Sequence, residues 1–294
     1  SDPNRKLLGD DEHAWCDRGV YNFENGCYAK TLNLTEKTEP EIYHAIFDEK
    51  NYLANGAILE NTMVYPSGKI DLSDERFSAN GRASYPLDAL DNIRKSSQAP
   101  HPRTILFLTA DASGVLPPIS KLETDQAKLW FLMGYTSKVA GTENGITEPI
   151  ATFSRFFGEP FMPSRPSIYM KLLGEKMEQH KTNVYLVNTG WIGGVYGKGG
   201  ERISLKYTRA MVEVANQGLL ENVTYKKEDF FNLSIPETCP NVPSEILRPI
   251  DNWKDKEAYK QEAEKLAEKF AKHFRENFGT HPISEEIIAF CPGM

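Results

Sequence analysis

The acidic run Asp10-Asp11-Glu12-His13 is the first group of residues in this sequence whose types suggest chemistry. Carboxylate oxygens are the ligands that Mg²⁺ and Mn²⁺ prefer in proteins. In a strand, alternation would place Asp11 and His13 on one face and Asp10 and Glu12 on the other. The spacing leaves two interpretations open: a metal site at Asp11 with Asp10 beside it, or an acidic turn in an acidic protein.

Two arginine-containing segments could recognise anions. Arg82 follows a turn signal at Asn80-Gly81, and the guanidinium group suits bidentate binding of phosphate or carboxylate. One arginine alone is also compatible with an ordinary surface position. The second segment runs from Arg202 to Arg209 into an expected helix, where Thr208 could serve as a cap or as a ligand hydroxyl.

The glycine-rich stretch 191–202 does not fit a phosphate-binding loop. Gly197-Lys198 is followed by Gly199 where the pattern requires Ser or Thr, and Ile192 stands where it requires Gly. We interpret the stretch as a tightly turned or flexible connection. The sequence contains no GxSxG nucleophile motif, and its histidines lack metal-ligand spacing.

Composition narrows the class of protein. The chain has 294 residues, with 34 Lys and Arg against 41 Asp and Glu, for a net charge of −7. This acidic balance argues against a nucleic-acid-binding protein. The sequence has neither an apolar run of membrane-spanning length nor a secretory signal, so we expect no membrane partner. The four cysteines form no CxxC pair, which favours reduced thiols in a cytoplasmic protein.

The hydrophobic pattern predicts a mixed α/β fold with irregularly interleaved strands and helices. Thr104–Thr109, which leads to Asp111, and Val184–Val187 are apolar runs typical of fully buried strands. The expected helices begin near Pro40 and span 124–139 (capped by Gly141), 169–180, 207–220 and 256–278. We expect short strands and turns over 21–34 and 51–86, and an irregular segment over 228–249.

Taken together, the motifs resemble those of ATP-dependent phosphoenolpyruvate carboxykinase. They occur in order and extend from residue 8 to about residue 250, which makes the resemblance far more specific than any single pattern. They are Leu8–His13, Asn25–Lys30, Glu39–Tyr43, Arg82–Pro86, Leu108–Asp111, Gly114–Pro118, Ala140–Glu143, Leu186–Trp191 and Arg202–Arg209. Ser113 and the segment 153–158 depart from the family pattern, but neither includes a residue with an expected role.

The resemblance implies a reaction and a set of roles. The family converts oxaloacetate and ATP to phosphoenolpyruvate, ADP and CO₂ in gluconeogenesis, using Mg²⁺ or Mn²⁺. By matching motifs, Asp11 and Asp10 would bind metal, and Arg82 would be catalytic and contact ATP, substrate and the transferred phosphoryl group. The other expected nucleotide-binding residues are Glu39, Arg202, Ile203, Thr208 and, as a weaker candidate, Lys30.

The resemblance covers nearly the whole chain but only about the C-terminal half of the family protein. It implies the mixed-sheet, nucleotide-binding kinase domain of that fold over 1–294, incomplete at its N-terminus, with a helical segment at 252–294. The phosphate loop, the oxaloacetate-binding groups and the metal-binding Lys and His lie outside this sequence. We therefore expect the chain to need the missing half as partner. Two alternatives remain: a non-catalytic adenine-nucleotide-binding or interaction module, and a GTP-using carboxykinase.

Overall fold

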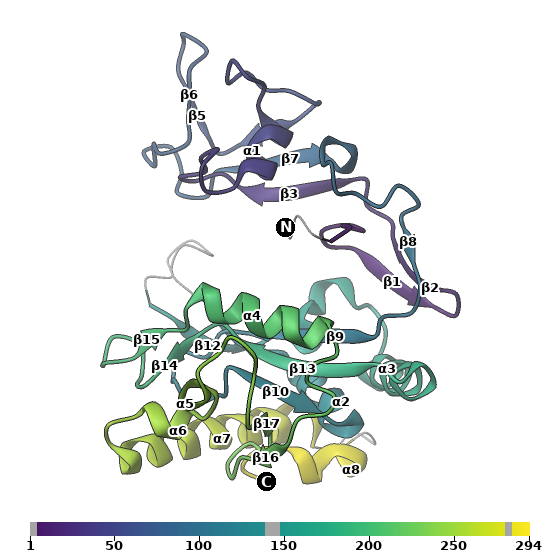
Figure 1. The fold of residues 1–294 in the computed structure, drawn as a ribbon, viewed down its shortest axis with the longest axis vertical. Coiled ribbons are helices and arrows are strands. Elements are labelled where there is room, and N and C mark those ends of the chain that lie inside the picture. Colours follow the sequence, from purple (N-terminus) through teal and green to yellow (C-terminus); the bar gives the residue numbers. More distant parts are fainter. Residues whose placement is uncertain (1–4, 139–147, 280–283) are drawn as a thin grey trace. The chain divides into compact units, whose positions relative to one another are not determined.

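The computed structural model describes residues 5–138, 148–279 and 284–294. The chain divides into two compact units, Ser1–Pro102 and Arg103–Met294 (Figure 1). Both units combine strands with helices, which confirms the predicted mixed α/β class. The assignment of 1–294 to one domain stays a prediction. Within the described ranges, no helix is both long and apolar enough to cross a membrane.

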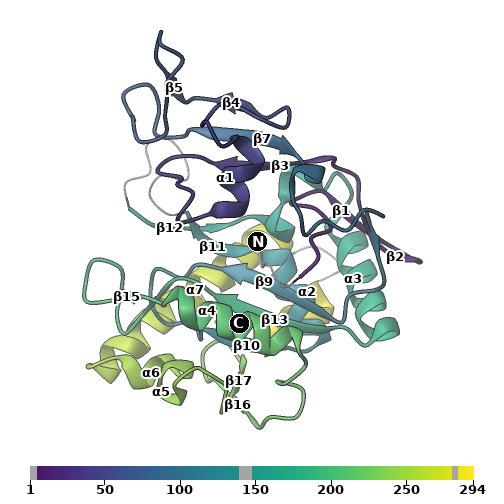
Figure 2. The same cartoon turned by 45° about the horizontal axis from the view of Figure 1, so that its top comes forward.

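Unit 1 is built on small antiparallel sheets. The strands β1 (His13–Cys16), β2 (Gly19–Asn22) and β8 (Gln98–Ala99) form one sheet, and β3 (Gly26–Lys30), β7 (Arg82–Pro86) and β4 (Ile58–Glu60) form another. Figure 2 shows α1 (Pro40–Ile46) against this second sheet. Alternation along β7 buries Ala83 and Tyr85 among apolar residues that include Ala45 and Ile46 of α1, so the opposite face remains accessible. The 3₁₀ turn η1 (Leu87–Ala89) follows β7.

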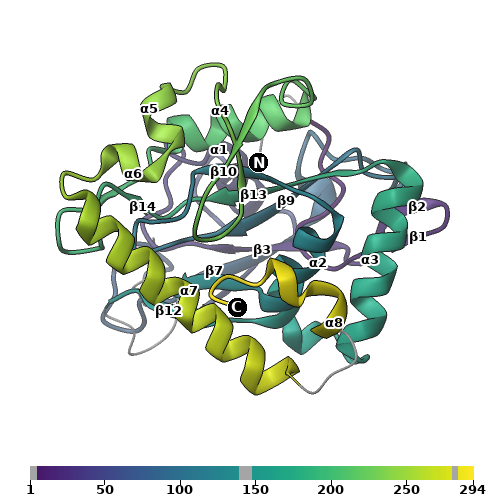
Figure 3. The same cartoon turned by 90° about the horizontal axis from the view of Figure 1, so that it is seen from below.

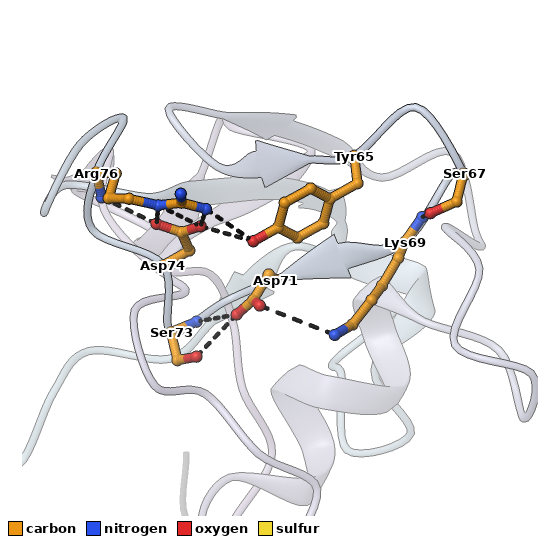
Figure 4. A network of polar contacts seen from close by, with 7 residues as sticks. All are labelled: Tyr65, Ser67, Lys69, Asp71, Ser73, Asp74 and Arg76. Carbon is orange, nitrogen blue, oxygen red and sulfur yellow. Dashed lines mark hydrogen bonds and ion pairs between the residues drawn. The ribbon is translucent and has the colours of Figure 1, made fainter.

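A polar network organises the hairpin of β5 (Met63–Val64) and β6 (Ile70–Asp71) and the turn that follows it (Figure 4). The Tyr65 hydroxyl donates to Asp74 Oδ2 at 2.8 Å, and Arg76 forms an ion pair with the same carboxylate. The hydrogen bonds from Arg76 and Tyr65 hold the pKa of Asp74 well below its ordinary value. The Ser73 N–H and hydroxyl donate to Asp71, so each aspartate closes a local turn.

Unit 2 is organised around a five-stranded mixed sheet. Its order is β16 (Tyr225–Lys227), β17 (Ser234–Pro236), β10 (Ile119–Leu122), β13 (Asn183–Asn188) and β9 (Thr104–Thr109). Only β13 and β9 run parallel, and the register pairs Asn188 with Thr109, so these two strands end side by side. Polar residues that follow two parallel strands are therefore brought together at one edge.

Helices cover both faces of this sheet (Figures 1 and 3). One face packs against α2 (Thr124–Met133), α3 (Pro166–His180) and α7 (Lys256–Phe278), and the other against α4 (Leu205–Asn216). Val184 and Leu186 of β13 enter the first core and Tyr185 and Val187 the second, which confirms this strand as fully buried. The remaining elements are β11 (Tyr135–Lys138), β12 (Ile150–Phe153), η2 (Arg155–Phe157), η3 (Glu159–Phe161), β14 (Trp191–Ile192), β15 (Glu201–Arg202), α5 (Ser244–Leu247), α6 (Pro249–Asn252), α8 (Ser284–Ile287) and η4 (Ile288–Phe290).

The predictions from periodicity hold best where an element is long. The helix expected over 256–278 is α7 with the same bounds, and its apolar stripe, Ala263, Leu266, Phe270 and Phe274, is buried. Asp255 caps this helix by accepting from the N–H groups of its first turn. The expected helices at 40 and 169–180 and the short strands over 21–34 and 51–86 are also present.

Two predictions about single elements are wrong, one of a helix boundary and one of burial. The helix expected over 124–139 ends at Met133, because Gly134 adopts a positive φ of 54° and the chain then enters β11; the proposed cap at Gly141 lies outside the described residues. The prediction that β9 is fully buried also fails, since β9 is an edge strand and Leu108 is 56% exposed. The segment expected to be irregular over 228–249 contributes β17 to the central sheet, as well as α5.

The Asp111 carboxylate is fully buried just after β9 and is surrounded by hydrogen-bond donors. It accepts from the N–H groups of Ser113, Val115 and Leu116 and from the hydroxyls of Ser113 and Tyr135. A buried charge is tolerated when its oxygens are satisfied in this way. The carboxylate therefore fixes the turn after β9 against β11.

We expect Asp111→Asn to destabilise unit 2 by about 3–5 kcal/mol, because the new NH₂ group must face N–H or O–H donors and leave them unpaired. Urea unfolding monitored by tryptophan fluorescence measures this loss. The control is Glu175→Gln on α3, an exposed partner of Lys171, which should change stability by less than about 0.5 kcal/mol. Equal effects of the two substitutions would contradict a structural role for Asp111.

Burial raises the pKa of Glu228 from its ordinary 4.5 to about 7, although two backbone N–H groups, of Phe230 and Phe231, donate to its carboxylate. Between these two pKa values the Glu228 carboxyl group thus stays protonated in the folded state and is deprotonated in the unfolded state. This contribution to stability is complete below pH 4.5 and is lost as pH rises through 7, by up to about 3 kcal/mol. Denaturation midpoints across this range should fall more steeply in the wild type than in Glu228→Gln; parallel curves would refute the assignment.

Candidate functional site

The Asp10-Asp11 pair lies in a bend before β1, not in a strand. The predicted alternation of faces over residues 10–13 is therefore wrong, because extended pairing begins only at His13. Glu24 fixes the bend: its Oε2 accepts from the N–H groups of Asp11 and Glu12 at 3.1 and 3.0 Å. Asp10 Oδ2 accepts from the Tyr28 N–H at 3.2 Å, which ties the bend to β3.

The chemistry of this pair fits part of a site for a hard divalent cation. Both aspartates are exposed and offer carboxylate oxygens, the donor type that Mg²⁺ and Mn²⁺ prefer. Among the described residues, however, no three His, Cys, Asp or Glu side chains are grouped so that they could hold a metal ion. The bend can therefore contribute ligands to such a site but does not complete it.

Two of the predicted nucleotide-binding residues are direct neighbours on the sheet of unit 1. The register pairs Lys30 of β3 with Arg82 of β7, and Arg82 with Glu60 of β4. All three alternate with buried or partly buried residues, so they lie on the face of the sheet opposite the core. Two cationic side chains on directly opposite residues of neighbouring strands can contact the same anion.

Tyr28 and Glu60 are contacts of Arg82 that sequence reasoning missed. The Arg82 guanidinium carbon lies 4.7 Å from the centroid of the Tyr28 ring, and Arg82 Nε lies 3.1 Å from Glu60 Oε1. A hydrogen bond to Glu60 raises the pKa of Tyr28 above its ordinary value. Tyr28 lies within a motif that the sequence analysis singled out, whereas Glu60 carries no sequence signal because its role depends on strand register.

Glu39 occupies the N-cap position of α1, and Pro40 lies at the first helical position, which agrees with the prediction of a helix with Pro40 near its first turn. Its side chain is exposed and makes no capping hydrogen bond, while its backbone carbonyl accepts from Tyr43 N–H. A carboxylate at the start of a helix is electrostatically favourable. The carboxylate therefore remains available to a ligand.

In unit 2 the glycine-rich stretch forms the hairpin of β14 and β15, which confirms the prediction of a tightly turned connection. Arg202 lies at its end, with the guanidinium carbon 5.1 Å from the Trp191 ring centroid and Nε donating to the Thr189 carbonyl at 3.1 Å. Gly200 must lack a side chain, because an added Cβ would lie 2.1 Å from the Gly194 carbonyl oxygen. The hairpin thus fixes the position of the Arg202 backbone, from which the side chain extends.

Ile203 and Thr208 follow this hairpin in different settings. Ile203 is buried in the core beneath α4, and its N–H donates to the Gly190 carbonyl. Thr208 lies inside α4, whose N-cap is Ser204, so the interpretation of Thr208 as a cap is wrong. Its hydroxyl is 3.4 Å from the Ser204 carbonyl oxygen. A role of this hydroxyl toward a ligand stays a prediction.

The predicted residues thus form two sets. Unit 1 brings Lys30 beside Arg82 and links Asp10 to the same strand through Tyr28, with Asp11 adjacent in the bend. Unit 2 carries Arg202, Ile203 and Thr208 between the end of the hairpin and the first turns of α4. Each set joins cationic or hydroxyl donors to backbone that local hydrogen bonds hold in place.

Comparison with known proteins gives one consistent result. A family model described as phosphoenolpyruvate carboxykinase matches residues 1–245. A Fusobacterium nucleatum protein named phosphoenolpyruvate carboxykinase (ATP) is 51% identical over 283 residues, which cover 96% of this chain and 52% of that protein. A protein of the same name from Staphylococcus aureus (strain Newman) is 54% identical over 279 residues, covering 95% and 51%. The chain spans about half the length of these curated relatives.

The role of Glu24 in holding the acidic bend is testable without a ligand. We expect Glu24→Ala to speed hydrogen exchange at the Asp11 and Glu12 amides and to cost about 1–2 kcal/mol of stability, because two N–H groups lose their acceptor. Exchange measured by NMR gives the site-specific rates. Asp91→Ala, which removes an exposed carboxylate elsewhere in unit 1, should leave them unchanged; unaltered rates in Glu24→Ala would contradict the arrangement.

Proposed function

Because this chain belongs to the ATP-dependent phosphoenolpyruvate carboxykinase family, we propose that it forms the nucleotide- and metal-binding part of an enzyme that converts oxaloacetate and ATP to phosphoenolpyruvate, ADP and CO₂. We assign residues 1–294 to the C-terminal kinase domain of that fold, with the helical segment at 252–294 as part of it. The four cysteines are free, which supports a reducing, cytoplasmic setting for an enzyme of gluconeogenesis.

The observation that carries the proposal is the cationic face formed by Lys30 and Arg82. Among the described residues, Arg82 pairs with Glu60 only through Nε, so its two η nitrogens retain their donors. Phosphoryl transfer depends on positioning and on stabilising charge that spreads over the transferred oxygens. A guanidinium group with its forked donors available on a rigid strand suits this task.

The residues then have distinct proposed roles. Decarboxylation of oxaloacetate leaves an enolate, whose oxygen attacks the γ-phosphoryl group while ADP leaves. Arg82 contacts the substrate and the transferred phosphoryl oxygens and stabilises the charge that develops on them. By the family resemblance, Lys30 and Glu39 contact the nucleotide, and Arg202, Ile203 and Thr208 are assigned to its base end. Mg²⁺ or Mn²⁺, when held by Asp11 with Asp10, would neutralise phosphate charge.

The alternative is a module that binds adenine nucleotide, or a partner, without catalysis. The chain spans about half of its relatives. From the family resemblance we expect the phosphate loop and the oxaloacetate-binding groups in the other part. Loss of one well-placed transition-state donor typically costs about 3–4 kcal/mol. We therefore propose that the 294 residues by themselves do not turn over and need that other part as partner.

We expect the purified 294-residue chain to form no phosphoenolpyruvate from oxaloacetate and ATP with Mg²⁺ or Mn²⁺. Joined to the part of the Staphylococcus aureus relative that it does not cover, it should do so. A coupled assay for phosphoenolpyruvate checks both. Turnover by the chain alone would contradict its proposed inactivity. A folded but inactive fusion protein would favour the alternative, a binding module without catalysis. Competition between ATP and GTP distinguishes the nucleotide class.

In the active fusion protein, Arg82→Ala should lower kcat by about a thousandfold and raise the ATP KM only a few-fold, because its interactions strengthen as charge develops on the transferring group. Steady-state kinetics separates the two parameters. Arg18→Ala, a change to an exposed arginine elsewhere in unit 1, serves as the matched control and should alter neither. A raised ATP KM with unchanged kcat for Arg82→Ala would show that Arg82 contributes only uniform binding and would contradict its role at the transition state.

A further inference from the structure

Arg82, Tyr28 and Glu60 form a closed group on the exposed face of the β3–β7–β4 sheet. Arg82 contacts both other residues, through the ion pair to Glu60 at 3.1 Å and the guanidinium–ring contact to Tyr28 at 4.7 Å. Tyr28 and Glu60 also interact with each other through the Tyr28 hydroxyl. The three residues come from three adjacent strands, so the sheet register sets their geometry.

The ion pair with Glu60 involves the Nε atom of the Arg82 guanidinium group. Arg82 Nε is buried from solvent and forms no well-aligned hydrogen bond, so its contact with Glu60 Oε1 at 3.1 Å is an ion pair. Arginine presents its remaining four N–H donors on the two η nitrogens. Within the described ranges those nitrogens have no partner. Glu60 therefore holds the inner edge of the group and leaves the outer edge for a ligand.

The tyrosine ring restricts the remaining freedom of the guanidinium plane. An arginine on a strand can rotate about several bonds, and ordering it costs conformational entropy. Contact with an aromatic face favours one orientation without supplying a neutralising negative charge. Tyr28 itself is held by the hydrogen bond from its N–H to Asp10, so the same strand links Arg82 to the acidic bend.

We propose that Tyr28 and Glu60 are positioning residues that orient Arg82 toward the transferred phosphoryl group without touching the substrate themselves. The inference rests on the proposed carboxykinase function and deepens it. It assigns a functional task to two side chains through their contacts with a third. Pre-ordering the guanidinium group means that less entropy is lost when the transition state forms.

The kinetic test uses the active fusion protein. Glu60→Gln and Tyr28→Leu should each lower kcat about tenfold and leave the ATP KM within twofold, while Tyr28→Phe, which keeps the ring, should retain most of the activity. In an Arg82→Ala background, Glu60→Gln should have no further effect on kcat, because it acts through Arg82. Glu49→Gln, at an exposed carboxylate elsewhere in unit 1, is the matched control.

A structural readout keeps the inference separate from the proposed function. In the ¹⁵N-labelled 294-residue chain, the Arg82 Nε–H signal is identified by its absence in Arg82→Lys. Its exchange with solvent should be slow in the wild type and at least tenfold faster in Glu60→Gln. An inactive wild-type fusion protein would count against the proposed function only, and this exchange rate would then decide whether the arrangement exists.

Three outcomes would overturn the inference. The first is a Glu60→Gln effect on kcat that persists in the Arg82→Ala background, which would indicate general structural damage. The second is an equal change in kcat and KM. The third is an Arg82 Nε–H exchange rate that is the same with and without the Glu60 carboxylate. A Glu60→Gln loss that disappears with Arg82, accompanied by faster exchange, supports it.

Discussion

The buried Asp111 carboxylate is the interaction on which the arrangement of unit 2 depends. Its side chain accepts from the turn that follows β9, and its backbone N–H donates to the Asn188 side chain at the end of β13. Its carbonyl accepts from the Trp191 N–H, at the start of the hairpin. Gly190 packs so closely against Asp111 that a Cβ there would lie 2.3 Å from its backbone. Asp111, through its buried and fully hydrogen-bonded carboxylate and through its backbone, therefore determines where the hairpin leading to Arg202 begins.

In unit 1 the strand register, and not a buried charge, determines where the side chain of Arg82 lies. Alternation on β7 sends Ala83 and Tyr85 into the core and Arg82 to the exposed face. A slip of one residue would exchange the two faces, placing the guanidinium group in the core and the apolar side chains in water. The free energy of burying this small core therefore also specifies the position of Arg82. Stability and site geometry depend on the same register.

The sequence predicts the long helix over 256–278 from its sustained periodicity and the buried strand at 184–187 from a continuous apolar run, and the mixture of such patterns predicts the mixed fold. It fails at residues 10–13, where hydrogen bonds to the distant Glu24 hold a bend. It also fails near 134, where Gly134, with its positive φ, ends a helix whose apolar pattern continues into β11. The contact of Glu60 with Arg82 joins residues on different strands. No local pattern encodes it, so it requires the register.

In each unit an aromatic ring helps to order an arginine without neutralising its positive charge. The protein is acidic, with a net charge of −7, yet the proposed site must present positive charge to phosphate. Carboxylates alone could order the arginines, but bidentate pairing would consume the donors and neutralise the charge that a ligand needs. Arg82 lies over Tyr28 and Arg202 over Trp191, and each also makes a single contact through Nε, to Glu60 and to the Thr189 carbonyl. Both arginines are thus held by a ring and through Nε, which orders them, while no contact among the described residues occupies their η nitrogens.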